Sequence, residues 1–267
     1  MLKKIKDFLK LSGEPSFQPS VKVDCLWQEI QKLPHVLTKK VVLINKYLSQ
    51  KAEAQPRDGF IVESGVGVIA ETKRIMTTYY FLMNDTPENQ EVFASFVNKF
   101  METHRREIIG IDEMTLEKMV VNLLHQKRLL ISCAESCTGG TLISRLISVP
   151  GASLVTQESY ITYSDQAKTK ILGIKQKYLE EFGTVSSEVA GKMAERVRIK
   201  AISDVGIGVT GYTTSDMPAP EDGLFYYGIS FHDTLIVDKD CVEGTRDEMR
   251  FDQTTIILWR LLSVLKE

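Results

Sequence analysis

The chain has 267 residues, of which 43% are hydrophobic and 25% charged, and its formal net charge is −2. This composition suits a folded chain with a sizeable core, and the near-neutral charge provides no basic field to hold a nucleic-acid backbone. No apolar run approaches the ~20 residues that span a bilayer, and the first residues lack the apolar block of a signal peptide. We therefore expect a cytoplasmic protein with no membrane span and no nucleic-acid partner.

The first twenty residues read as an amphipathic segment and a linker. In "MLKKIKDFLKL" the apolar residues fall on one helical face and the lysines elsewhere, which suits either a membrane-surface or partner helix or a helix docked on its own domain. The following "SGEPSFQPS" interrupts regular structure because its prolines remove hydrogen-bond donors. We assign residues 1–20 to this segment and linker.

Residues 21–110 predict a small α+β accessory domain of unknown role. Its elements are a helix "LWQEIQKL" at 26–33, a helix "TKKVVLINKYLSQK" at 38–51, strands within 59–71 and 74–83, and a helix at 86–106 that Thr86 caps. This region carries no recognisable chemical constellation. Oligomerisation is one role open to it, and we expect a homo-oligomer, a dimer or higher.

Residues 111–267 alternate helices with short apolar strands, which predicts an α/β layered sandwich with a mixed sheet and flanking helices. In "DVGIGVTG" the glycines share one strand face, where a helix can pack closely. Thr245 and Glu248 form a capping box before the last helix. The predicted helices are 115–128, 139–149, 164–173, 186–202 and a C-terminal helix, and the predicted strands are 129–134, 159–163, 204–211, 224–231 and 235–242.

The stretch "CAESCTGG" places Ser136 in a glycine-rich turn between a strand and a helix. Backbone N–H groups at such a turn favour an anion or a developing oxyanion. A serine nucleophile needs a base, and none of the four scattered histidines falls in a strand-to-helix turn. The same lack of a histidine disfavours a Cys137 thiolate, so we interpret Cys137 as a packing residue. The cysteines and histidines also form no metal-ligand pattern, and we predict no metal and no cofactor.

The next turn, "YITYSDQAKTK", supplies a candidate base. If Tyr163 ends its strand and Ser164 caps the next helix, Lys168 lies one turn into that helix and can look back to the strand end. Lysine acts as a base at neutral pH only if its pKa is lowered, and a tyrosine hydroxyl could relay the proton. From the residues alone, a capping serine, a strand-end tyrosine and a solvated lysine are the more usual interpretation of these two turns.

Five motifs in order, "AESCTGG", "YSDQAK", "GTVSSEVAGKMAE", "GVTG" and "GTRDEMR", resemble the C-terminal domain of the CinA family of nicotinamide-nucleotide amidohydrolases. The resemblance covers residues 112–267. It implies hydrolysis of nicotinamide mononucleotide, a small pyridine nucleotide, to nicotinic acid mononucleotide and ammonia without a metal or organic cofactor. It places the family's nucleophile on Ser136, its base on Lys168 and its assisting tyrosine on Tyr163.

We predict substrate-binding residues around this trio. Glu135 either orients the turn or is a surface carboxylate, and the two arginines near the start of the last helix either bind a phosphate or form ordinary ion pairs. The turn residues would offer N–H groups to the oxyanion or the phosphate. The predicted binding residues are Glu135, Thr138, Gly139, Gly140, Thr210, Gly211, Tyr212, Thr213, Arg246 and Arg250.

The sequence departs from the family after Gly211. The family usually continues with a glycine-rich "IAGPGGG" loop, whereas this chain has "YTTSDMPAPEDG", which is bulkier and stiffer. The altered loop 212–222 leaves two alternatives open. One is a hydrolase of a different amide or NAD-like compound, and the other is a non-catalytic nucleotide-binding regulatory module.

Overall fold

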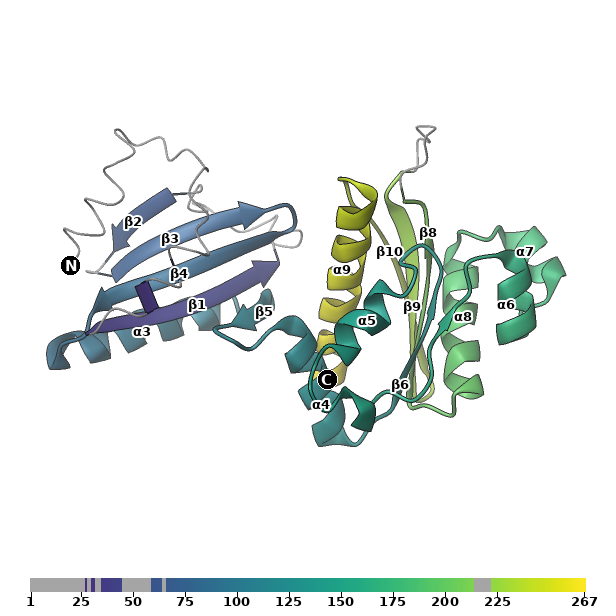
Figure 1. The fold of residues 1–267 in the computed structure, drawn as a ribbon, viewed down its shortest axis with the longest axis horizontal. Helices are drawn as coiled ribbons and strands as arrows, with labels where there is room; N and C mark the ends of the chain where they lie inside the picture. The colour runs from purple at the N-terminus through teal and green to yellow at the C-terminus, as the bar shows by residue number, and fades with distance from the viewer. Residues whose placement is uncertain (1–26, 28–29, 32–34, 45–58, 64–65, 214–221) are drawn as a thin grey trace. The chain divides into compact units, whose positions relative to one another are not determined.

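The computed structural model describes residues 27, 30–31, 35–44, 59–63, 66–213 and 222–267 (Figure 1). The predicted amphipathic segment and linker, 1–20, lie outside these residues. The chain forms two compact units that divide between Thr115 and Leu116. This division falls after the predicted boundary at residue 110, because strand β5 (Ile108–Ile111) pairs with β1 of the first unit.

The first unit is an antiparallel sheet with a helix against it. The strand order is β2-β3-β4-β1-β5, and helix α3 packs on the face that carries Phe81. Thr86 occupies the N-cap position of α3, as predicted, but its side chain makes no capping hydrogen bond. The elements before β5 are β1 (Val36–Ile44), β2 (Gly59–Glu63), β3 (Val66–Lys73), β4 (Met76–Asn84) and α3 (Pro87–Thr103).

The predicted helix at 38–51 is wrong over its described part, because residues 36–44 form strand β1. β1 pairs with β4 on one side and β5 on the other, so its backbone groups are satisfied by neighbouring strands. Val41 and Leu43 point to the same face and are fully buried in the core with Phe93 of α3. Tertiary pairing therefore decides the conformation of this segment.

The second unit contains a mixed sheet with strand order β10-β9-β8-β6-β7. β6 is parallel to β7 and β8, and β9 is antiparallel to both β8 and β10, which confirms the predicted mixed α/β sheet. The 3-10 turn η1 and helix α7 were not predicted. The elements are α4 (Leu116–Lys127), β6 (Ile131–Glu135), α5 (Thr141–Ile147), η1 (Ala152–Leu154), β7 (Tyr160–Ile161), α6 (Asp165–Leu172), α7 (Gln176–Phe182), α8 (Ser187–Lys200), β8 (Val205–Gly211), β9 (Leu224–Phe231), β10 (Thr234–Cys241) and α9 (Arg246–Lys266).

Helices cover both faces of this sheet (Figure 1). α8 lies directly on one face, with α6 and α7 packed beside it, and α9 lies on the other face with α4 and α5. The predicted capping box at the start of α9 is present, formed by Thr245 and Glu248. Among the described helices, none has the length and apolarity needed to cross a bilayer.

The predicted close approach of a helix to the glycine face of β8 is confirmed at Gly208. A Cβ atom on Gly208 would lie 2.3 Å from the Ala190 carbonyl oxygen of α8. Real Cβ atoms do not approach a backbone oxygen so closely, so α8 can sit at this distance only because β8 has no side chain there. The carboxyl ends of the parallel strands β6, β7 and β8 meet at one edge of the sheet, where ligand sites of α/β proteins form.

Candidate active site

Ser136 directly follows β6 at this edge of the sheet. Its N–H donates to the Val209 carbonyl at 3.0 Å, which continues the pairing of β6 with β8. On the other side the Thr162 N–H, just after β7, donates to the Glu135 carbonyl at 2.7 Å. The serine is therefore fixed between the ends of two strands, with 7% of its surface exposed.

Glu135 lies beneath the turn and is buried, with 1% of its surface exposed. Its carboxylate accepts hydrogen bonds from the N–H groups of Gly140 (2.9 Å), Leu142 (3.1 Å) and Ile143 (2.9 Å). These N–H groups open α5, where a carboxylate is stabilised by the positive end of the helix dipole. Of the two roles open to Glu135, the structure therefore supports orienting the turn, and its assignment as a substrate-binding residue is corrected.

Two of the three expected oxyanion or phosphate donors, the N–H groups of Gly139 and Gly140, have acceptors inside the turn. The Gly140 N–H is bonded to Glu135, and the Gly139 N–H donates to the Ser136 carbonyl at 3.1 Å. Thr138 is fully buried. The prediction that Gly139 and Gly140 offer N–H groups to a ligand is therefore wrong, because both groups already have acceptors within the turn.

Arg250 of α9 holds the same turn from outside. Its Nε donates to the Thr138 carbonyl at 3.0 Å, and one of its terminal nitrogens lies 3.4 Å from the Gly139 carbonyl oxygen. Its third nitrogen lies 3.6 Å from the exposed Asp247 carboxylate. The predicted phosphate contact of Arg250 is therefore replaced by a structural one, since the guanidinium binds the turn's carbonyls.

Lys168 lies beside Ser136. Ser164 caps α6 by accepting the Ala167 N–H at 3.1 Å, and Lys168 follows one turn later with its side chain fully buried. Its Nζ lies 3.4 Å from Ser136 Oγ and 3.3 Å from the Tyr163 carbonyl oxygen. Burial lowers the pKa of this amine below its ordinary 10.5, because the charged form loses hydration.

The Tyr163 side chain points to a different partner. Its hydroxyl lies 3.3 Å from a terminal nitrogen of Arg246, and the residue is 61% exposed. Within the described residues, neither Ser136 nor Lys168 is bonded to that hydroxyl; Ser136 Oγ lies 3.5 Å from the Tyr163 carbonyl oxygen instead. The tyrosine thus meets the Ser–Lys pair through its backbone, in contrast to the predicted hydroxyl relay.

Cys137 is a poor competitor as nucleophile. Its side chain is buried, and burial raises the pKa of the thiol to about 12. The reactive form of cysteine is the thiolate, which is scarce at neutral pH when the pKa is this high. The structure therefore agrees with a packing role for Cys137.

A cavity of about 340 Å³ opens beside Ser136. Its volume lies in the range of small-molecule sites. The predicted residues Thr210, Gly211, Tyr212, Thr213 and Arg246 all line it, together with Ser136 and Tyr163. The positions 214–221 of the altered loop lie outside the described residues. Sequence reasoning missed the lining residues Thr184, Val185 and Asp222.

Arg246 provides the positive charge among the described lining residues of this cavity. Besides the Tyr163 hydroxyl, it donates to the Thr213 carbonyl at 2.9 Å. Thr184 precedes α8 within the "GTVSSEVAGKMAE" motif, so the motif itself was the signal that could have found it. Across the described part of the chain, no three His, Cys, Asp or Glu residues gather as metal ligands.

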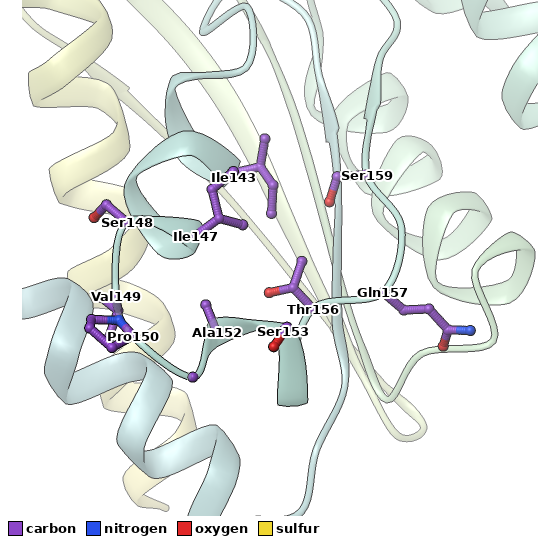
Figure 2. A pocket seen from close by; sticks show the side chains of 11 residues that line it. Ile143, Ile147, Ser148, Val149, Pro150, Ala152, Ser153, Thr156, Gln157 and Ser159 are labelled. Atoms are coloured by element: carbon purple, nitrogen blue, oxygen red, sulfur yellow. The ribbon is translucent and has the colours of Figure 1, made fainter.

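A second, larger cavity of about 590 Å³ lies beside the segment that follows α5 (Figure 2). It is lined by aliphatic, hydroxyl and amide side chains, including Ile143, Ile147 and Gln157, and none of its lining residues is ionisable at neutral pH. Acid–base chemistry needs a group that can exchange a proton, so the smaller cavity beside Ser136 is the candidate active site.

Fold and site together define an α/β protein in which Ser136 lines a small cavity at the carboxyl edge of parallel strands and the buried Lys168 lies beside Ser136. The chain belongs to the CinA C-terminal domain family, which matches residues 87–265. The match begins ahead of residue 112, where the resemblance predicted its start, and so includes α3 and β5.

Individual relatives agree with this assignment. A CinA-like protein of Kosmotoga olearia is 41% identical over 145 residues, which are 54% of this chain and 35% of that protein. A relative from Caldanaerobacter subterraneus is 38% identical over 165 residues, 61% of this chain and 40% of its own length. The solved competence or damage-inducible protein of Enterobacter asburiae is 26% identical with a TM-score of 0.54, over 56% of this chain and 96% of that one. The chain thus spans about two fifths of the curated relatives' length.

Proposed function

We propose that this chain hydrolyses the carboxamide of nicotinamide mononucleotide to nicotinic acid mononucleotide and ammonia. The observation that carries the proposal is the pair of Ser136 Oγ and Lys168 Nζ, 3.4 Å apart and buried beside a cavity of small-molecule size. A buried lysine whose pKa is lowered can accept a proton at a pH where an exposed lysine cannot.

The pair can perform the reaction in two steps. Ser136 Oγ attacks the carboxamide carbon while Lys168 takes the hydroxyl proton, and the tetrahedral intermediate collapses as the lysine passes that proton to the departing nitrogen. Ammonia leaves and an acyl ester on Ser136 remains. Water then attacks the ester with Lys168 again as the base, and the lysine returns the proton to Ser136 as the acid is released.

The cavity walls support a nucleotide substrate. Arg246 supplies a guanidinium suited to a phosphate, and Thr213 and Tyr212 stand beside it. The chain resembles a family of nicotinamide-nucleotide amidohydrolases, and this resemblance is our reason for proposing a pyridine carboxamide as the group that is hydrolysed. We further propose that the protein acts as a homo-oligomer in the cytoplasm, as expected from the sequence.

The proposal is tested by incubating the protein with nicotinamide mononucleotide and measuring ammonia. We expect Ser136→Ala and Lys168→Ala each to lower the rate by at least about 10³-fold, because members of a nucleophile–base pair act as a unit. Lys170→Ala, an exposed lysine on the same helix, is the matched control and should retain the wild-type rate.

Two outcomes would contradict the proposal. Ammonia release that survives Ser136→Ala would exclude the serine mechanism. Binding of the nucleotide without ammonia release, measured by calorimetry on the wild-type protein, would instead favour a non-catalytic nucleotide-binding regulatory module.

A further inference from the structure

The charged surroundings of Lys168 are asymmetric. On its own helix the Asp165 Oδ1 atom lies 4.0 Å from Nζ, and the turn after β6 contributes the Cys137 thiol. Arg196 of α8 contacts α6 at its other end, where it donates to the Leu172 carbonyl. Arg246 of α9 contacts the Tyr163 hydroxyl rather than the amine. The charged group that acts on the Lys168 amine is therefore the Asp165 carboxylate. This carboxylate has no part in the reaction steps proposed above.

The position of this carboxylate is fixed by a neighbouring segment. The Thr184 hydroxyl lies 2.8 and 2.9 Å from the two Asp165 oxygens. The Thr184 carbonyl in turn accepts a hydrogen bond from the buried Thr210 hydroxyl at the end of β8, at 2.9 Å. These contacts connect α6, which carries Lys168, to the segment before α8 and to the end of β8. Thr184 and Thr210 also line the cavity.

We propose that Asp165, held by Thr184, is a positioning residue that keeps the Lys168 amine beside Ser136 and sets the pH at which this amine becomes a base. The catalytic part of this inference rests on the proposed function. The electrostatic part does not, because it concerns the amine itself.

The sign of the effect follows from the charges. Burial favours the neutral amine and lowers the pKa of Lys168, whereas the Asp165 carboxylate favours the ammonium ion and raises that pKa. Removing the carboxylate leaves the effect of burial unopposed. The pKa of Lys168 should then fall, and the acid limb of the pH–rate profile should move to lower pH.

Asp165→Asn isolates the charge, because asparagine keeps the size of the side chain and a hydrogen-bond partner for Thr184. We expect the Lys168 pKa to fall by about one unit, the lower end of what an opposite charge within 4–6 Å produces. The measurement is an NMR titration of the full chain with nitrogen-15-labelled lysine, in which the Lys168 signal is assigned by its loss in Lys168→Met.

Two further variants separate charge from other effects. Thr184→Val keeps the carboxylate but removes the hydroxyl, so it should shift the Lys168 pKa less than Asp165→Asn does. Glu180→Gln removes an exposed carboxylate from the neighbouring α7 and should leave the titration of Lys168 unchanged.

The outcomes distinguish this inference from the proposed function. A Lys168 titration that is the same in Asp165→Asn and wild type overturns the inference, whatever the substrate. A lowered pKa together with an acid limb of ammonia release that shifts in parallel supports it, and a lowered pKa with an unmoved acid limb overturns the positioning role. If wild-type protein releases no ammonia from nicotinamide mononucleotide, the proposed function fails, and the titration still decides the electrostatic part.

Discussion

At the end of β6, two adjacent residues perform different tasks. Glu135 is buried and accepts three N–H groups that open α5, while Ser136 lies beside the cavity and Lys168. A helix N-terminus in this position is often available to an anion, but here the protein's own carboxylate occupies it. A phosphate of the proposed substrate would therefore have to bind elsewhere, and Arg246 lines the cavity beside Ser136.

The placement of the Tyr163 hydroxyl gives a prediction for Tyr163→Phe. Since this hydroxyl lies beside Arg246 and its backbone carbonyl lies beside Lys168, the substitution should raise KM several-fold and lower kcat by less than about 10-fold. A proton relay would instead lose about 10²–10⁴-fold in kcat. Steady-state kinetics of ammonia release over a range of substrate concentrations separates the two, and a large loss in kcat would restore the relay role.

Among the elements, sequence reasoning succeeded where local pattern and tertiary environment agree. The alternation in β8, the capping box of α9 and the Ser164 cap of α6 were all readable, because each depends on residues close in sequence. The β1 segment was misread as a helix, because its conformation depends on pairing with β4 and β5, which lie far along the chain. Such non-local pairing overrides local propensity.

The contact of α8 with β8 gives a prediction at the level of the element. Gly208→Ala should destabilise the protein by about 3 kcal/mol, because the new methyl group would overlap the Ala190 carbonyl and force the helix away. Gly151→Ala is the matched comparison. A Cβ atom added at Gly151 would meet nothing within 4 Å, so the only penalty is the left-handed backbone conformation of this residue, with φ 85°. The substitution should therefore cost about 1 kcal/mol.

Urea unfolding followed by circular dichroism measures both free energies of unfolding. If both substitutions lower the free energy of unfolding equally, α8 can move away from β8 without a cost in stability. That result would contradict the idea that close packing of α8 on β8 stabilises the second unit.

On the scale of the whole molecule, each of the two units contains a buried hydrophobic cluster of its own. Phe81 of the first unit is fully buried, with its ring centroid 5.0 Å from that of Phe100, whereas Ile207 is fully buried in β8 of the second. We expect Phe81→Ala to cost about 4 kcal/mol and to increase hydrogen exchange in residues 66–111 while exchange in residues 116–267 stays unchanged.

Ile207→Ala is the reciprocal variant and should act only on the second unit. Hydrogen exchange read by mass spectrometry reports both regions in one experiment. If either substitution raises exchange throughout the chain, the two units unfold as one cooperative body.

The sequence predicted that Ser136 and Lys168 lie together, but it did not settle the roles of Glu135 and Arg250 beside them. Ser136 and Lys168 belong to motifs with a fixed order, and the parallel ends of β6 and β7 bring them together. The roles of Glu135 and Arg250 could not be read, because a carboxylate or guanidinium near a turn serves a ligand or the backbone according to three-dimensional direction alone. Thr184 and Asp165 were missed as a pair because they meet across two separate segments.

The adjacency of Glu135 and Ser136 has a consequence for how this turn can change in length. The carboxylate reaches residues 140–143 only when the intervening turn has its present number of residues, whereas strand pairing with β7 and β8 places Ser136 at the start of that turn. An inserted or deleted residue anywhere in 136–140 would move the start of α5 away from the Glu135 carboxylate that caps it. This segment should therefore tolerate exchanges of side chain at Cys137 far better than any change in the number of residues.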